Sequence, residues 1–165
     1  MIDFSPFQIR RIAAADDPKI AAIIRRNLEK FHLNLPGTVY FDPELDHLSE
    51  FYNAVPEKRA YFILTDNQGE VVGGVGFAEF DGFENCVELQ KLYLTDATKG
   101  YGLGKKLMQY VSQQAHATGY QRLYLETHSN LETAVHIYHK LGFQQIEKPD
   151  FVRHSTMNLF FIMDF

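Results

Sequence analysis

The feature that most constrains the fold of this chain is a glycine-rich segment, residues 100–104, that joins a strand-like pattern to a helix-like one. Polar and apolar side chains alternate over residues 86–94, whereas residues 103–117 carry an apolar residue at every third or fourth position. Glycines allow backbone amides to crowd together, and at the start of a helix these amides and the helix dipole attract phosphate. Lys99 and Lys105 add positive charge. The segment therefore predicts an anion-binding loop.

Two familiar phosphate-binding motifs do not fit this loop. A Walker loop requires Ser or Thr after Gly-Lys, whereas Lys106 follows Lys105 here. A dinucleotide-binding fingerprint needs a wider gap between its second and third glycines than Gly102 and Gly104 provide. A purely structural glycine turn would have the same sequence, so the loop alone does not decide between a turn and a phosphate site.

The strand pattern before the loop changes phase near its middle. Val87 and Leu89 fall on one face and Glu88 and Gln90 on the other. Leu92 continues the apolar face only if one residue is inserted. An inserted residue in one strand is a β-bulge, which flips the side chains that follow it. We therefore predict a bulge near Gln90-Lys91.

The remaining patterns predict one α/β domain that spans residues 1–165 and contains a mixed sheet. The predicted strands cover residues 7–12, 61–65, 71–80, 86–94, 122–126, 143–147 and 156–165, and the predicted helices 17–31, 43–53, 103–117 and 130–141. Asp17 and Asn130 are expected to cap the first and last helices. Three glycines in the strand 71–80 indicate a bulge or a close approach by another part of the chain.

The composition excludes several classes of protein. A formal net charge of -5 argues against a broad nucleic-acid-binding surface, so no nucleic-acid partner is expected. No run approaches the ~20 apolar residues of a membrane-spanning helix. The single cysteine, Cys86, excludes an internal disulfide and fits a reducing compartment, and the first residues have no signal-peptide pattern. We therefore expect a cytoplasmic protein with Cys86 as a buried thiol.

No metal site is expected. His136 and His139 lie three residues apart on the last predicted helix, a spacing that could share a metal ion. No third ligand is evident, and structural metal sites use four ligands. A solvated helix face explains the two histidines better.

The ordered motifs in residues 86–143 resemble the GNAT (GCN5-related N-acetyltransferase) superfamily. Residues 99–104 match its Gln/Arg-x-x-Gly-x-Gly/Ala pyrophosphate signature, and residues 88–94 are similar to its central strand. Residues 130–143 are similar to its helix with Asn, Ala and Tyr followed by Gly-Phe. Lys99 departs from the pattern, because it keeps the charge of Arg without the fork geometry.

The resemblance implies a single-domain GNAT fold and acetyl-CoA as cosubstrate. This fold is a mixed, mostly antiparallel sheet of about seven strands, flanked by helices and splayed at its central strands, and it often forms homodimers. Amides after the bulge would pair with the pantetheine arm in the splay, and the glycine loop would hold the pyrophosphate. Asn130 would contact the arm, although capping alone also explains it. The implied cofactor-binding residues are Leu92, Tyr93, Leu94, Lys99, Gly100, Tyr101, Gly102, Leu103, Gly104, Lys105, Asn130 and Ala134.

The resemblance also implies two catalytic groups. An amine that attacks a thioester must first lose a proton, and the leaving thiolate must gain one. Glu88 matches the position of the general base, acting directly or through water, and Tyr138 matches the general acid. From the residues alone, Glu88 could equally be an exposed strand carboxylate and Tyr138 a core aromatic residue beside Ile137 and Leu141.

The acceptor side is the least readable part of the sequence. The resemblance points to the first helix pair, its loop and the end of the sixth strand, and each residue there is more commonly structural than functional. The candidates are Tyr40, Phe41, Glu79, Glu126 and His154. A cationic amine is favoured if Glu126 and Glu88 both face the cleft.

The resulting hypothesis is an acetyl-CoA-dependent N-acetyltransferase that moves the acetyl group directly to a primary amine of a small molecule or peptide. The alternative is a non-catalytic regulatory module of the same fold that binds acetyl-CoA, but such a module would need neither Glu88 nor Tyr138. A nucleotide-dependent enzyme that uses the same glycines is disfavoured by the missing Walker Ser or Thr.

Overall fold

Seven strands form one continuous sheet in this protein. The structure, a computed structural model, describes residues 1–152 and 155–165. The strands are β1 (Gln8–Arg11), β2 (Ala60–Thr65), β3 (Val71–Phe80), β4 (Cys86–Leu94), β5 (Arg122–Thr127), β6 (Gln144–Ile146) and β7 (Leu159–Asp164). Their order is β1-β2-β3-β4-β5-β7-β6, and all neighbours are antiparallel except β4 and β5, which are parallel. The expected mixed, mostly antiparallel sheet is confirmed.

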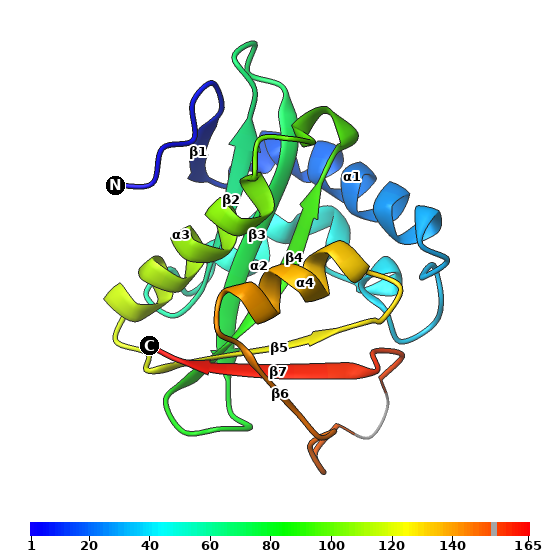
Figure 1. Cartoon of the computed structure of the whole chain (residues 1–165). Helices are drawn as coiled ribbons and strands as arrows, with labels where there is room; N and C mark the ends of the chain where they lie inside the picture. Colours follow the sequence, from blue (N-terminus) through cyan, green and yellow to red (C-terminus); the bar gives the residue numbers. More distant parts are fainter. Residues whose placement is uncertain (153–154) are drawn as a thin grey trace.

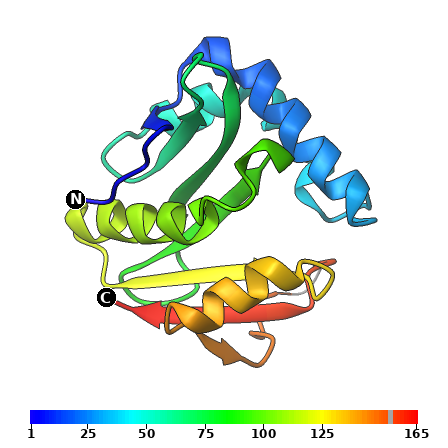
Figure 2. The ribbon, with the colours of Figure 1, turned by 45° about the horizontal axis from the view of Figure 1, so that its top comes forward.

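Helices cover both faces of the sheet (Figures 1 and 2). They are α1 (Asp17–Lys30), α2 (Leu48–Asn53), α3 (Leu103–Ala117) and α4 (Glu132–Lys140). Side chains alternate between the faces of a strand, so β2 sends Phe62 towards α3 and Tyr61 towards α1. One face therefore packs against α1 and α2 and the other against α3 and α4. Among the described residues, no helix combines the length and the apolar character needed to cross a membrane.

The predicted cap of α1 is wrong. Asp16, not Asp17, occupies the N-cap position. The buried carboxylate of Asp17 instead accepts hydrogen bonds from the backbone N–H of Ser49 at 2.8 Å and from its hydroxyl at 2.6 Å. The first amides of a helix lack partners within the helix, and Ser49 lies in the buried first turn of α2. Asp17 therefore supports the neighbouring helix rather than its own.

Two other helix starts also differ from the sequence prediction. The second helix begins at Leu48 instead of Pro43, because residues 45–47 form a separate 3-10 turn. In the last helix, Leu131 takes the N-cap position and no side chain caps it. Asn130 is thus not a cap, because its side-chain amide donates to the Phe31 carbonyl oxygen at 3.1 Å, at the end of α1.

The predicted bulge in β4 is confirmed by the pairing with β3. Gly76 lies opposite Gln90, whereas Gly74 lies opposite Tyr93, so two steps along β3 match three steps along β4. Lys91, inside this interval, has a φ of 54°. This left-handed conformation is uncommon for residues other than glycine and is characteristic of bulges.

Two glycines of β3 make room for the aromatic ring that holds the bulge. A Cβ atom on Gly74 or Gly76 would lie 2.6 Å from an atom of the Tyr61 ring. The Tyr61 hydroxyl reaches across β3 and donates to the Lys91 carbonyl oxygen at 2.8 Å. The glycines in this strand therefore mark a close approach, as the sequence predicted.

The sheet splays between β4 and β5. Only the segment Cys86–Glu88 pairs with Arg122–Tyr124. Beyond these pairs, β4 continues beside β3 and β5 continues beside β7, and Figure 1 shows the two strands diverging. The predicted splay at the central strands is thus confirmed, and a gap opens next to the bulge.

The crowding around Tyr61 leads to a stability prediction. Gly76→Ala should lower the free energy of unfolding by about 2 kcal/mol, because overpacking a filled core costs roughly 1–3 kcal/mol. Urea unfolding of Gly76→Ala, Tyr61→Ala and the double variant measures the effect. If the clash with the ring is the cause, the two changes are non-additive. Full additivity would contradict this explanation.

Candidate active site

The glycine loop forms an uncapped helix N-terminus. Gly100 and Gly102 have φ values of 85° and 66°, and Gly102 is the N-cap residue of α3. No side chain caps this end of α3. The N–H of Lys106 donates to the Gly102 carbonyl oxygen at 3.2 Å, so the three amides before Lys106 have no partner within the helix. This arrangement suits the binding of an anion.

The charged side chains around the loop are exposed. The Lys99 ammonium lies 2.9 Å from the Asp96 carboxylate, which also accepts from Lys30 at 3.1 Å. Lys105, in the first turn of α3, is exposed as well. Among the other predicted loop residues, Leu103 contributes its side chain to the core, and Tyr101 is exposed with its ring edge-on to Phe7. Any role of Tyr101 and Leu103 in binding therefore lies in their backbone amides.

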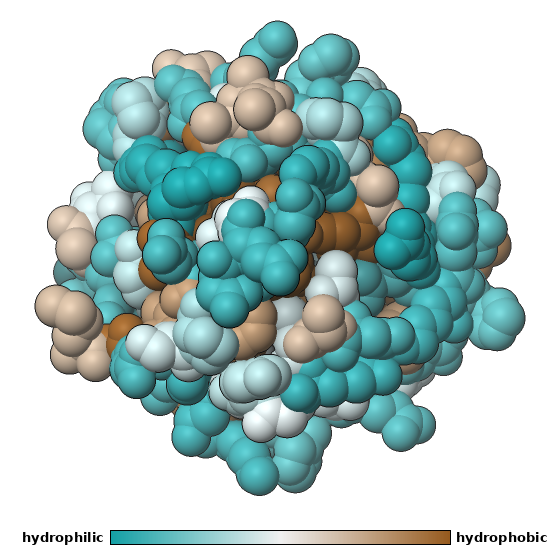
Figure 3. Space-filling model, turned by 90° about the horizontal axis from the view of Figure 1, so that it is seen from above, coloured by the Kyte–Doolittle hydropathy of each residue, from teal (hydrophilic) through white to brown (hydrophobic). Residues whose placement is uncertain are grey.

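Apolar side chains from β4 and α4 line the approach to the gap. Leu92, Leu94, Ala134 and Ile137 are partly buried against the core beneath α3 and α4. A Cβ atom on Gly104 would lie 3.0 Å from Ile137, so glycine lets α3 and α4 come close here. Figure 3 shows the molecule from above, with hydrophobic residues recessed among hydrophilic ones.

The backbone after the bulge is partly engaged already. The Leu94 carbonyl oxygen accepts from the Asn27 side chain at 3.2 Å. Tyr93 packs on the opposite face, against the α1 side of the core, where burial raises the pKa of its phenol. Only part of the segment Leu92–Leu94 is therefore open to a ligand in the gap.

Tyr138 lies on the α3–α4 face of the sheet, beside the gap. Its side chain is 5% exposed and packs against Phe143 and Phe161, with ring centroids 5.8 and 5.6 Å away. Burial raises the pKa of its phenol to about 12, and a hydrogen bond with Thr127 partly offsets this. Thr127 ends β5, beyond the last residue that pairs with β4. The phenol is therefore protonated at neutral pH and lies where the strands have separated.

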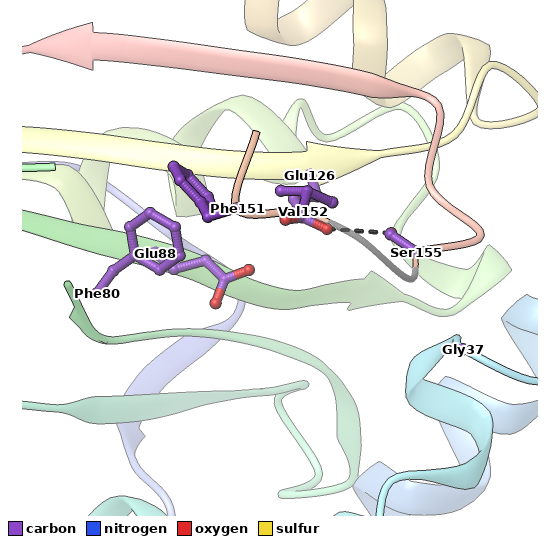
Figure 4. A pocket seen from close by; sticks show the side chains of 7 residues that line it. All are labelled: Gly37, Phe80, Glu88, Glu126, Phe151, Val152 and Ser155. Carbon is purple, nitrogen blue, oxygen red and sulfur yellow. Dashed lines mark hydrogen bonds between the residues drawn. The ribbon is translucent and has the colours of Figure 1, made fainter. Parts of the chain in front are cut away.

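Glu88 lies on the opposite face and lines a cavity of about 470 Å³. The other lining residues come from the loop before α2, the end of β3, β5 and the connection to β7, and they are Gly37, Phe80, Glu126, Phe151, Val152 and Ser155. Figure 4 shows the Glu88 carboxylate directed into this space from β4, with Gly37 across from it. The structure thus places Glu88 and Tyr138 on the two sides of the sheet, at the same gap.

The electrostatic environment of Glu88 favours its neutral form. Burial raises the pKa of Glu88, and the negative charge of Glu126 raises it further. Gln90 opposes the effect, because its side-chain N–H donates to Glu88 at 2.9 Å and lowers the pKa. The Gln90 side-chain oxygen in turn accepts from the Tyr52 hydroxyl at 2.6 Å.

Glu126 is held by two hydroxyl groups. The Tyr124 hydroxyl donates to one carboxylate oxygen at 3.1 Å. The Ser155 hydroxyl donates to the other at 3.2 Å (Figure 4). Phe80 and Phe151, with ring centroids 5.5 Å apart, form an aromatic wall of the same cavity. The cavity therefore combines two carboxylates with apolar rings.

A partly buried ion pair connects the loop before α2 to the bulge. The Lys91 ammonium lies 3.5 Å from the Asp42 carboxylate, and the Lys91 side chain is only 5% exposed. Burial raises the pKa of Asp42, whereas the Lys91 charge lowers it. The pair holds one wall of the acceptor side against β4.

Three further acceptor-side candidates, Glu79, Tyr40 and Phe41, do not line the cavity. Glu79 pairs with Arg59, on the α3 face of the sheet. Tyr40 donates to Glu29 at 2.6 Å, and Phe41 is exposed. His154 lies outside the described residues.

Cys86 is buried, as expected, and burial raises the pKa of its thiol to about 12. A thiol with this pKa is a poor nucleophile. Across residues 1–152 and 155–165, no group of three or more His, Cys, Asp or Glu side chains is placed to hold a metal ion.

Several residues of the site escaped the sequence analysis. Strand alternation placed Gln90 on the same strand face as Glu88, but the hydrogen bond between them was not predicted. Tyr52, Phe80 and Phe151 are distant in sequence, and only the folded chain brings them to Glu88 or its cavity.

Comparison with known sequences decides the family. A model of the acetyltransferase (GNAT) family matches residues 20–143, which is most of the chain. The chain belongs to the GNAT family. The match includes the glycine loop, Glu88 and Tyr138.

Relatives of this GNAT protein agree in sequence and fold. The uncharacterized N-acetyltransferase YjgM of Escherichia coli K12 is 39% identical over 141 residues, which cover 84% of this chain and 83% of YjgM. A GNAT-family acetyltransferase from Staphylococcus aureus Mu50 superposes with a TM-score of 0.81 at 19% identity, covering 96% of this chain and 98% of its own. The acetyltransferase yncA from Salmonella typhimurium, solved with acetyl-CoA, has a TM-score of 0.72 at 24% identity, covering 96% and 93%. The GNAT fold and the acetyltransferase class follow from these likenesses.

The environment of Glu88 leads to a stability prediction for this GNAT protein. Because folding raises the pKa of Glu88, the folded chain binds this proton more tightly than the unfolded chain. The resulting stabilisation is present below the unfolded pKa and is lost as the pH rises through the folded pKa. Glu88→Gln should therefore be more stable than the wild type at neutral pH, by about 1.4 kcal/mol for each unit of pKa shift.

Urea midpoints at several pH values test this expectation. The advantage of Glu88→Gln should shrink towards acidic pH, where both side chains are neutral. Glu84→Gln, at an exposed position, serves as the control and should show no such trend. A Glu88→Gln variant less stable than the wild type at neutral pH would contradict the argument.

Proposed function

We propose that this GNAT protein transfers an acetyl group from acetyl-CoA directly to a primary amine, without a covalent enzyme intermediate. The observation that carries the proposal is the common gap: an uncapped helix N-terminus leads to it, Tyr138 lies beside it on one face, and Glu88 faces a cavity on the other. A simple binding protein would need only the first of these features.

The residues of the loop and gap fit acetyl-CoA. The amides of residues 100–105 would bind the diphosphate, and Lys99 and Lys105 would add positive charge. The segment Leu92–Leu94 and Ala134 would line the pantetheine arm. Asn130 would contact the arm near the end of α1, where its amide donates to the Phe31 carbonyl. When bound, acetyl-CoA supplies the acetyl thioester.

Glu88 would remove the proton from the incoming ammonium group, directly or through a water molecule. Its raised pKa brings this carboxylate closer to the strength that a general base needs near neutral pH. The amine nitrogen then forms a bond to the acetyl carbon, and the carbon–sulfur bond breaks.

Tyr138 would donate its phenolic proton to the departing sulfur. Its pKa of about 12 keeps the phenol protonated, so a proton is available beside the sulfur as negative charge develops there. The attacking nitrogen still carries one proton more than the amide product, and this proton returns to the phenolate as the carbon–sulfur bond breaks. After the product leaves, Glu88 releases its proton to solvent, so the protein is restored and the reaction sets one proton free.

The acceptor cavity supports a small cationic amine as substrate. Glu88 and Glu126 both line the cavity, and negative side chains attract an ammonium group. Phe80 and Phe151 would pack against the apolar part of the acceptor and provide cation–π contacts. A volume of about 470 Å³ fits a small molecule or the end of a peptide.

The glycine loop gives the first prediction from this proposal. Gly102→Ala should weaken coenzyme A binding about tenfold, because alanine resists the left-handed backbone by roughly 1–2 kcal/mol and the amides would reorient. No atom lies within 4 Å of the added Cβ, so the change is confined to the backbone. Titration calorimetry with coenzyme A measures the affinity.

Gly119→Ala is the matched control for this variant. Gly119 follows the other end of α3, also has a left-handed φ, and also has no atom within 4 Å of an added Cβ. Its affinity for coenzyme A should equal that of the wild type. Equal affinities of all three proteins would contradict the loop assignment, and competition by ATP or NAD would indicate a nucleotide-dependent enzyme instead.

The role of Tyr138 gives the second prediction. Tyr138→Phe should reduce kcat by about 100-fold or more, the usual range for a lost acid–base group, and leave the affinity for acetyl-CoA unchanged. Release of free thiol over a panel of amines measures turnover. Tyr110→Phe, which also changes a ring packed against aromatic neighbours, is the control and should retain activity.

Two outcomes of the same assay would count against the proposal. Unchanged turnover in Tyr138→Phe would remove Tyr138 as the acid. Acetyl-CoA binding by the wild type without thiol release across a broad amine panel would favour a regulatory module that binds acetyl-CoA and does not catalyse transfer.

A further inference from the structure

A chain of side-chain hydrogen bonds leads from α2 to Glu88. The Tyr52 hydroxyl donates to the Gln90 side-chain oxygen at 2.6 Å, and the Gln90 side-chain N–H donates to Glu88 Oε2 at 2.9 Å. Tyr52 is 0% exposed, so no solvent competes for its hydroxyl. The base position is thus connected to a helix on the acceptor side of the sheet.

The chemistry of the three groups fixes the direction of both bonds. An ionised carboxylate can only accept, so Gln90 must present its N–H to Glu88. The amide oxygen then faces Tyr52, which must donate. Burial raises the pKa of Tyr52 well above its usual value, and the hydroxyl therefore keeps its proton. Rotation of the Gln90 amide by half a turn would turn its oxygen towards the carboxylate and break the bond to Glu88, and the Tyr52 hydroxyl would have to accept from the amide instead of donating to it.

The regular part of β4, before the bulge, places Gln90 beside Glu88. Glu88 and Gln90 lie two residues apart, on the same face of β4, and pair with Ala78 and Gly76 of β3. A Cβ atom on Gly76 would lie 3.2 Å from the Tyr52 ring, so glycine leaves the space that the ring occupies. Gln90 is the last residue before the left-handed turn at Lys91, so the next residue along the strand cannot take its position beside Glu88.

We propose that Tyr52 and Gln90 are positioning residues for Glu88, which hold its carboxylate towards the acceptor cavity and favour its ionised form. This inference rests on the proposed role of Glu88 as the general base. Neither residue lines the acceptor cavity, so both act through Glu88.

The hydrogen bond from Gln90 acts against the groups that raise the pKa of Glu88. Burial and the Glu126 charge raise the pKa of Glu88, and Gln90 and Lys91 lower it. Among the described residues, the titratable groups that face Glu88 come from α2, β4, β5 and the loop before α2, and they are Tyr52, Cys86, Lys91, Tyr124, Glu126 and Asp42. Gln90 is the group that donates a hydrogen bond to the carboxylate itself.

The test is the pH dependence of kcat/KM in Gln90→Leu and Tyr52→Phe. The acid limb of this profile reports the general base of the free enzyme. Without the Gln90 donor, the limb should move to higher pH by about one unit, the size expected for a hydrogen bond to a charged group. Tyr52→Phe frees the amide to rotate and should give a smaller shift in the same direction. KM for acetyl-CoA should not change.

Tyr61→Phe is the matched control. Tyr61 is as buried as Tyr52 and loses a comparable hydrogen bond, but its partner is the Lys91 backbone carbonyl. The acid limb of its kcat/KM profile should lie at the same pH as that of the wild type, even if its stability or kcat changes. The same acceptor amine is used with every variant, so the ionisation of the substrate affects all profiles equally and drops out of the comparison.

Carbon-13 NMR titration of the Glu88 carboxyl group separates this inference from the function it rests on. The signal is assigned by its loss in Glu88→Gln. A pKa raised in Gln90→Leu and Tyr52→Phe, with the kinetic limb following it, supports both proposals. A raised pKa without movement of the limb supports the positioning role and removes Glu88 as the base. A Glu88 pKa that is unchanged in both variants overturns the positioning role. If Gln90→Leu does not fold, the Glu88 pKa in Tyr52→Phe, which keeps the ring, is the deciding measurement.

Discussion

The hydrogen bond from the Tyr61 hydroxyl to the Lys91 carbonyl oxygen holds the conformation on which the site depends. The carbonyl belongs to a residue with a left-handed backbone, and it lies outside the regular pairing of β3 and β4. A buried carbonyl without a partner would cost free energy, so the phenol makes the bulge tolerable. Small residues in β3 admit the ring, and the bulge then turns β4 away from β5.

The site divides its tasks between the two faces of the sheet. Tyr138 is surrounded by aromatic rings on the α3–α4 side, which suits a group that must keep its proton. Glu88 lies on the other side among polar partners and a second carboxylate, which suits a group that must lose and regain one. The gap between β4 and β5 is where these two environments meet, so each pKa is set by its own face.

Much of this arrangement was predictable from local sequence. The phase change after Leu89 located the bulge, and the glycine-rich segment located the start of α3, because both are properties of a few consecutive residues. The helix caps were less predictable. Asp17 and Asn130 hydrogen-bond to Ser49 and Phe31, which lie 32 and 99 residues away.

The same limit applies to the site. Glu88 and Tyr138 were identified through a resemblance, and their roles stay predictions. The partners of Glu88 were not identified, since Tyr52 meets Gln90 only through packing of α2 on the sheet. The aromatic wall of the cavity forms where the end of β3 meets the chain before β7, a contact that no local pattern encodes.

The left-handed turn at Lys91 also has a consequence for solubility. A strand that has lost its neighbour exposes unpaired amides and carbonyls, and such an edge can recruit an extended segment of another molecule and seed aggregation. A bulge interrupts the even spacing of these groups and twists the strand. The turn at Lys91 divides the unpaired edge of β4 into two short stretches, Leu89–Gln90 and Leu92–Leu94, each too short for a foreign strand to add stably. The bulge that separates β4 from β5 therefore also hinders another molecule from adding a strand to the unpaired edge.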